Sequence, residues 1–121
     1  MTVEKVNLAR KFALFDDRFH PKVVAALNDH EVKVVKVLGE FVWHKHDAED
    51  ELFLVVLGKL TIRFRDGDVD LEPGELVVVP RGVEHMPVAH EEALIVLIEP
   101  ATTRNTGDVV NERTVETLEH I

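Results

Sequence analysis

The sequence predicts an all-β fold, an antiparallel barrel or sandwich, because of two features of the chain. From Pro21 onward, short runs of strand-forming residues alternate with turn signals at regular intervals, a pattern typical of such folds. Hydrophobic residues make up 45% of the 121 residues, which is enough for one core. We therefore expect a single domain over residues 1–121, with its barrel at about residues 21–99.

The N-terminal residues 4–16 differ from the rest, because their apolar side chains follow a rough helical or irregular spacing. We expect them to form an arm that packs on the barrel. Nine strands are expected to follow, at residues 22–27, 31–38, 41–46, 52–57, 59–65, 69–71, 75–79, 84–88 and 93–98.

Turn residues separate these expected strands. Asn28-Asp29 and Asp66-Gly67 are good hairpin turns. Pro73-Gly74 and Pro80-Arg81-Gly82 mark points where the backbone turns sharply. Residues 101–110 are a polar loop, and the apolar spacing in residues 111–121 predicts a short C-terminal helix.

The composition excludes several classes of function. The net charge is −9, and no basic stripe is present, so no nucleic-acid partner is expected. The chain has no cysteine, which excludes disulfides and thiolate ligands. The longest apolar runs have six residues, whereas a membrane span needs about 20. The N-terminus lacks the apolar region of a signal peptide, so we expect a cytoplasmic protein without a membrane partner.

The most informative motif is His44-Lys45-His46, followed by Glu51 and, much later, by His85. Alternate residues of a strand face the same side, roughly 6.6 Å apart, so the first two imidazoles can converge on one ion. Glu51 has the wrong parity for an unbroken strand, so the acidic residues 47–50 must turn or bulge. Three imidazoles and a carboxylate form the ligand set of a mononuclear transition-metal site.

Each part of this pattern also has an ordinary explanation. A lone His-x-His on a strand more often belongs to a polar face than to a ligand pair. Glu49 and Asp50 compete with Glu51 as candidate ligands, although parity favours Glu51. The remaining histidines are expected to be exposed or structural: His20, His30, His90 and His120.

The two motif blocks resemble those of the cupin superfamily, specifically the small single-domain "cupin 2" or mannose-6-phosphate-isomerase-like group. The blocks are Gly39-x4-His44-x-His46-x4-Glu51-x6-Gly58 and Gly74-x5-Pro80-x-Gly82-x2-His85, and the resemblance covers about residues 31–99. It implies an antiparallel double-stranded β-helix, the jelly-roll or cupin barrel, with a metal in its mouth. The implied ligands are His44, His46, Glu51 and His85, and the implied metal is Fe, Mn, Ni, Zn or Cu. The second block departs from the family at Ala89, where asparagine is usual.

The resemblance leaves two main classes of function open. One is a metalloenzyme acting on a small oxygen-containing metabolite, of oxygenase or isomerase type, with the metal as Lewis acid. The other is a non-catalytic barrel that binds or senses a small molecule; a barrel with an incidental metal is a third reading. A roomy polar pocket beside an open metal position would favour catalysis, whereas packed side chains over the site would favour a structural metal.

A homodimer is also expected. If His44 and His46 face inward, Trp43 faces outward and should be covered, either by the N-terminal arm or by a second subunit. The arm carries three phenylalanines, Phe12, Phe15 and Phe19, more aromatic surface than one small barrel is expected to bury. Arms that pack across a two-fold axis would use both groups of residues.

Overall fold

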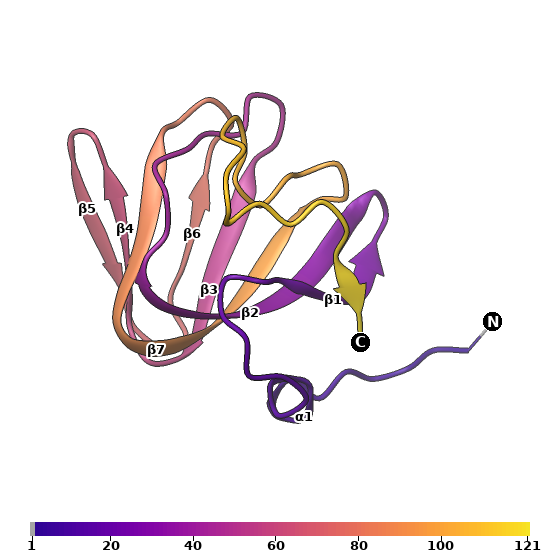
Figure 1. Cartoon of the computed structure of the whole chain (residues 1–121). Helices are drawn as coiled ribbons and strands as arrows, with labels where there is room; N and C mark the ends of the chain where they lie inside the picture. Colours follow the sequence, from indigo (N-terminus) through magenta and orange to yellow (C-terminus); the bar gives the residue numbers. More distant parts are fainter. Residues whose placement is uncertain (1) are drawn as a thin grey trace.

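The computed structural model describes residues 2–121 and confirms the all-β fold class (Figure 1). In this part of the chain the elements are α1 (Leu8–Phe12), β1 (Lys22–Leu27), β2 (His30–Glu40), β3 (Glu51–Leu57), β4 (Leu60–Phe64), β5 (Gly67–Leu71), β6 (Leu76–Val79), β7 (His85–Pro100) and β8 (Glu119–His120). Among residues 2–121, no helix has the length and apolar character that crossing a membrane requires.

Strand β7 organises the barrel, because it pairs with three other strands. One edge of β7 pairs antiparallel with β2. The opposite edge pairs with β4 near the start of β7 and with β3 near its end. Strands β5, β6 and β1 extend β4, β3 and β2 respectively, and β8 pairs parallel with β1. Figure 1 shows β7 strongly curved, so that these branches enclose a common interior.

Alternate residues of the strands fill this interior. On β3, Phe53 and Val55 face inward, and on β7 Ile95 and Leu97 do the same, as the two-residue period of a strand requires. They pack with Leu60, Ile62 and other apolar side chains into one buried cluster. The same alternation turns Glu51, at the start of β3, and Glu99, near the end of β7, into the interior.

The N-terminal arm packs on the outside of the barrel, as predicted. Asn7 caps α1 by accepting a hydrogen bond from the backbone N–H of Arg10, at 3.0 Å. Phe12 is buried against Val34 and Val96, which face outward from β2 and β7. Further along, Phe19 enters the interior and stacks on Phe41, with ring centroids 5.2 Å apart. The arm therefore explains why β2 and β7 are apolar on both faces.

Three expectations about strands were wrong in detail. Residues 41–46 do not form a strand, apart from a single bridge between His44 and His85. The expected strands at 84–88 and 93–98 are one continuous strand, β7. Ala89, which lies outside both expected strands, is buried within β7 opposite Gly39. The register shifts between Val37 and Gly39, where β7 advances four residues (Ala93 to Ala89) and β2 advances two, so β7 carries the extra residues while Gly39 on β2 has a φ of +83°.

The predicted C-terminal helix at residues 111–121 was also wrong, since these residues form turns that end in β8. Local side-chain hydrogen bonds replace helical ones here. Asn111 accepts from the backbone N–H of Arg113 at 2.9 Å, and Thr114 accepts from that of Asn111 at 3.0 Å. Such bonds offer the backbone an alternative to a helix. The ion pair between Lys22 and Glu119, at 2.9 Å, accompanies the pairing of β8 with β1.

Candidate metal centre

Backbone hydrogen bonds join the two motif blocks. His44 and His85 exchange two such bonds, with N–O distances of 3.0 and 2.9 Å. The N–H of Gly82 donates to the carbonyl of His46 at 2.8 Å, and the N–H of Arg81 donates to the carboxylate of Asp50 at 2.9 Å. These bonds place the irregular segment before β3 beside the start of β7.

The structure brings His44, His46, Glu51 and His85 together, as the sequence predicted. One ligand atom from each residue lies within 4.8 Å of the others, and all four residues are buried. Glu51 is the first residue of β3 and faces the interior, so the segment 47–50 turns as the parity argument required. Of the competing carboxylates, Glu49 accepts a hydrogen bond from Thr102 and Asp50 from Arg81, and neither joins the cluster.

The other histidines lie outside the cluster. His20, His90 and His120 are exposed, as expected. His30 is half-buried and lies 2.8 Å from the carboxylate of Asp29 in the turn between β1 and β2. These four residues therefore offer no second histidine-rich site.

Two of the clustered imidazoles have a fixed orientation. The Nδ1 of His44 lies 2.9 Å from the carbonyl of Val42, and the Nδ1 of His85 lies 2.9 Å from that of Val83. Because a carbonyl can only accept, each Nδ1 carries the proton and each Nε2 presents a lone pair to the cluster. This is the arrangement that a metal-binding histidine needs.

His46 provides the test of whether a metal fits. Both of its ring nitrogens are buried without a hydrogen-bond partner. Its Nε2 lies 3.3 Å from a carboxylate oxygen of Glu51 but makes no aligned hydrogen bond to it. An unpartnered buried nitrogen costs free energy, and a cation bound by the four side chains would satisfy it. The donor set therefore fits a transition metal.

The electrostatics of the site favour the metal-binding protonation states. Burial, followed by the nearby His85, lowers the pKa of His44 to about 4, so this imidazole is neutral at pH 7. Burial alone would raise the pKa of Glu51, but the imidazoles of His46 and His85 hold it well below its usual range. The site therefore offers a neutral imidazole at His44 and an ionised carboxylate at Glu51, which are the forms that bind metals.

Glu99 is a buried residue beside the site that the sequence did not identify. Its carboxylate accepts a hydrogen bond from Lys33 at 2.9 Å, and its second oxygen has no partner. Burial and the charge of Glu51 raise the pKa of Glu99 well above its usual value. In the sequence, Glu99 follows the apolar run of residues 93–98, two positions after Leu97. A residue at such a strand end can be either buried or exposed, so the pattern did not identify Glu99.

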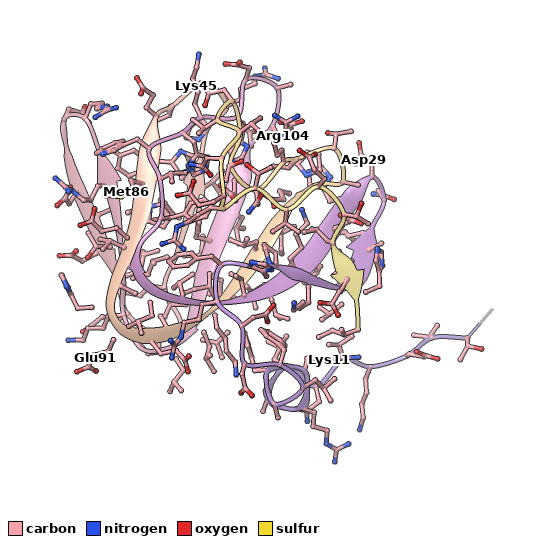
Figure 2. The ribbon with its side chains drawn as sticks, viewed as in Figure 1. Lys11, Asp29, Lys45, Met86, Glu91 and Arg104 are labelled. Atoms are coloured by element: carbon pink, nitrogen blue, oxygen red, sulfur yellow. The ribbon has the colours of Figure 1, made fainter. Side chains whose placement is uncertain are left out.

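Two cavities adjoin the cluster. A cavity of about 50 Å³ lies inside the barrel against His44, Glu51 and Glu99, and its other walls are mainly apolar. A cleft of about 580 Å³ reaches His46 and is lined by polar residues of the C-terminal segment. Lys45 and Arg104 both line this cleft, and Figure 2 shows them at the end of the molecule opposite Glu91. The site therefore adjoins a small apolar space and a larger polar one.

The cover of Trp43 differs from both alternatives predicted from the sequence. The guanidinium carbon of Arg65 lies 3.8 Å from the centroid of the Trp43 ring, and that of Arg63 lies 5.9 Å away. One chain also buries Phe12 and Phe19, so the aromatic residues of the arm need no second subunit. Trp43 and the arm consequently provide no argument for a dimer.

Comparison with known proteins agrees with this fold and site. Residues 32–99, more than half of the chain, match the family Cupin_2, described as cupin domain. The chain belongs to this cupin-domain family. A crystal structure of a cupin-2 domain containing protein from Shewanella frigidimarina NCIMB 400 has a TM-score of 0.78 and 50% identity, over 78% of this chain and 93% of that one. The barrel is therefore the cupin barrel that the motif blocks predicted.

Two curated relatives come from Bacillus subtilis strain 168. The protein YdbB is 33% identical over an alignment of 87 residues that covers 63% of this cupin and 77% of YdbB. Acireductone dioxygenase is 31% identical over an alignment of 80 residues that covers 62% of this cupin and 45% of the dioxygenase. The match to the dioxygenase thus spans less than half of that enzyme.

Proposed function

We propose that His44, His46, Glu51 and His85 bind one divalent transition-metal ion, with Fe, Mn, Ni, Zn and Cu as the candidates. The observation that carries this proposal is the convergence of the four donors within 4.8 Å in a buried site. The unpartnered nitrogens of His46 and the lowered pKa of His44 support it, because both favour a bound cation. Imidazole and carboxylate donors suit each of these metals, so the donor set does not select among them.

We further propose that the protein is a metalloenzyme acting on a small oxygen-containing metabolite, of oxygenase or isomerase type. A bound ion would supply Lewis acidity to an oxygen atom of the ligand. The chain itself supplies apolar walls, including Phe53 and Ile95, that exclude water from the space beside His44 and Glu51. Similarity to acireductone dioxygenase supports an oxygenase, and the polar cleft at His46 supports access by a polar ligand.

The alternative is a barrel that binds a small molecule without catalysing a reaction. The small, largely apolar cavity beside Glu51 favours this alternative, because it offers few groups for acid–base chemistry. Glu99 is the additional acid there, and Lys33 already engages one of its oxygens.

One experiment separates the two functions. Protein purified from its native host is analysed for metal by mass spectrometry, reloaded with the metal found, and screened against small keto, hydroxy and enediol compounds. Turnover that is lost in His46→Ala and retained in the exposed control His90→Ala would support the enzyme. Saturable ligand binding without turnover would support the binding barrel, and absence of bound metal would contradict the metal site.

We also propose a homodimer formed through the outer face of β3 and β6. On this face Leu76 and Val78 of β6 are about half exposed, beside the half-buried Leu52 and Leu54 of β3. Strand β6 pairs only with β3 among the described elements, so its other edge is open. Because the chain carries a net charge of −9, a second copy can approach most easily over an uncharged face.

Light scattering at micromolar concentration tests the dimer. We expect a mass of twice 13.7 kDa for the wild type and about 13.7 kDa for Val78→Lys, which places a charge on the proposed interface. Val110→Lys is a matched control, because Val110 is exposed but lies in the C-terminal loop. A monomeric wild type would contradict the dimer, and an unchanged dimer in Val78→Lys would contradict this interface.

A further inference from the structure

Three glutamates lie side by side across three neighbouring strands of the barrel. Glu31 of β2 pairs directly with Glu99 of β7. On the other side, Leu52 of β3 pairs with Ile98, so the continued antiparallel register sets Glu51 opposite Glu99. Like charges on directly opposite residues destabilise a sheet. The row therefore needs an explanation other than the stability of the barrel.

Lys33 is the cation that contacts this row. It shares a face of β2 with Glu31, and its ammonium lies 2.9 Å from Glu99 and 3.8 Å from Glu31. The side chains of Lys33 and Glu99 are 1% and 2% exposed. A buried ion pair of this kind contributes little net stability, because desolvation offsets the attraction between the charges.

The position of Glu99 relative to the metal site is unusual. Glu99 and the candidate ligand Glu51 line the same small cavity, yet Glu99 is not among the four converging donors. One of its oxygens has no partner and the other is held by Lys33. A free carboxylate beside a divalent cation would be attracted to it and is a common ligand.

We propose that Lys33 keeps Glu99 from becoming a fifth protein ligand and so preserves an open position for an external ligand on the metal. This inference rests on the metal site proposed above. Glu99 also lies opposite Glu51 in the continued β3–β7 register, so a change in the Lys33–Glu99 pair can alter the orientation of Glu51. Lys33 and Glu99 are therefore positioning residues. They act on the metal by orienting Glu51 and by keeping one coordination position free.

The test uses Co(II), whose absorption spectrum reports the number of ligands, and azide, which binds at open positions. In Lys33→Met, Glu99 is released, so we expect a weaker visible Co(II) absorption, loss of the spectral change on adding azide, and Co(II) binding that is about tenfold tighter. In the double variant Lys33→Met/Glu99→Leu, the additional ligand is absent, so the wild-type spectrum and the response to azide should return. An apolar pair commonly replaces a buried ion pair without loss of folding.

Lys22→Met is the matched control, because Lys22 is also a nearly buried lysine paired with two carboxylates, Asp17 and Glu119. It should leave the Co(II) spectrum and the azide response unchanged. If Lys33→Met is poorly stable, the melting temperature still tests the proposal. Co(II) should raise the melting temperature of Lys33→Met more than it raises the melting temperature of the wild type.

The outcomes separate this inference from the metal site itself. Lys33→Met could behave like the wild type in its Co(II) spectrum, its response to azide and its increase in melting temperature with Co(II). That result would overturn the role of Lys33 while leaving the metal site intact. Failure of the double variant to recover the response to azide would also overturn it. A wild-type protein that binds no Co(II) would overturn the metal site and, with it, this inference.

Discussion

Two parts of the barrel interior are equally buried but have opposite chemistry. Around Leu60 and Ile62 the side chains are apolar and at most 1% exposed. Around His85 and Glu99, exposure is equally low but the side chains are ionisable. Burial stabilises the first part by about 25 cal/mol per Å² of apolar surface and is unfavourable for the second unless its groups are paired. The comparison indicates that the apolar part supports the fold, and it agrees with the proposal that the polar part binds a metal ion.

The largest effect is expected from removing a histidine of the cluster. His44→Ala, His46→Ala or His85→Ala should weaken metal binding at least about 100-fold, because loss of even an outer partner costs 10- to 100-fold. The barrel should remain folded, since these residues are not part of its apolar cluster. Metal content by mass spectrometry and circular dichroism measure the two effects.

Glu51→Gln should have a milder effect, because an amide oxygen can still coordinate a metal. Glu49→Gln is its control, since Glu49 lies outside the cluster. Full metal occupancy in all three histidine variants would contradict the ligand assignment. Loss of metal in Glu49→Gln but not in Glu51→Gln would show that the wrong carboxylate was chosen.

The apolar part should respond in the opposite way. Ile62→Ala removes a fully buried side chain and should lower the free energy of unfolding by about 2–5 kcal/mol. Its metal affinity in the folded state should stay unchanged. Urea denaturation and calorimetric metal titration measure these quantities, with Val69→Ala on the more exposed β5 as the control. A large loss of metal affinity in Ile62→Ala would show that the two parts are not separate.

The third effect is a loss of stability in acid. The pKa of His44 is lowered from 6.5 to about 4, so the unfolded chain takes up a proton at a higher pH than the folded chain. Stability from this residue is therefore present above pH 6.5 and is lost as the pH falls towards 4, by about 3 kcal/mol in total.

Urea denaturation of the metal-free protein between pH 7 and pH 4 measures this dependence, and His44→Gln should reduce its slope. Bound metal should be released over the same acidic range, because protonated imidazole cannot coordinate. Stability of the wild type that is constant with pH, or metal occupancy unchanged at about pH 4, would contradict a buried three-histidine site.

The sequence predicted His44, His46 and Glu51 from local spacing, whereas His85 was assigned through the resemblance of the second motif block. His44 and His46 are two residues apart, and the parity of Glu51 required the turn that the structure contains. The arm and most strands were likewise predictable from short apolar patterns. Lys33 and Glu99 were not predictable, because their contact joins residues 66 positions apart and depends on the register of β2 against β7.

The C-terminal segment was predicted wrongly for a related reason. Val115, Leu118 and Ile121 have helical spacing, but the hydrogen bonds of Asn111 and Thr114 and the pairing of β8 determine the structure. Two hydrogen bonds between residues 101–121 and Lys45, which lies between two candidate ligands, also join distant partners. Lys45 and Asp108 are 63 positions apart, and Lys45 donates its backbone N–H to the carboxylate of Asp108 at 3.0 Å. The N–H of Asp108 donates to the carbonyl of Lys45 at the same distance.

The smallest effect tests this contact between the C-terminal segment and the metal site. Gly107 has a φ of +57°, and a Cβ there would overlap the carbonyl of Lys45 and approach the His44 ring to 3.1 Å. Gly107→Ala should therefore displace the segment or the imidazole and weaken metal binding about tenfold, as outer-partner changes do. Gly74→Ala is the matched control, because Gly74 has a φ of +85° and nothing lies within 4 Å of its Cβ position. Both variants should lose about 1–2 kcal/mol of stability from the left-handed backbone, and only Gly107→Ala should lose metal affinity in a calorimetric titration. Equal affinities in the two variants would show that the C-terminal segment does not position His44.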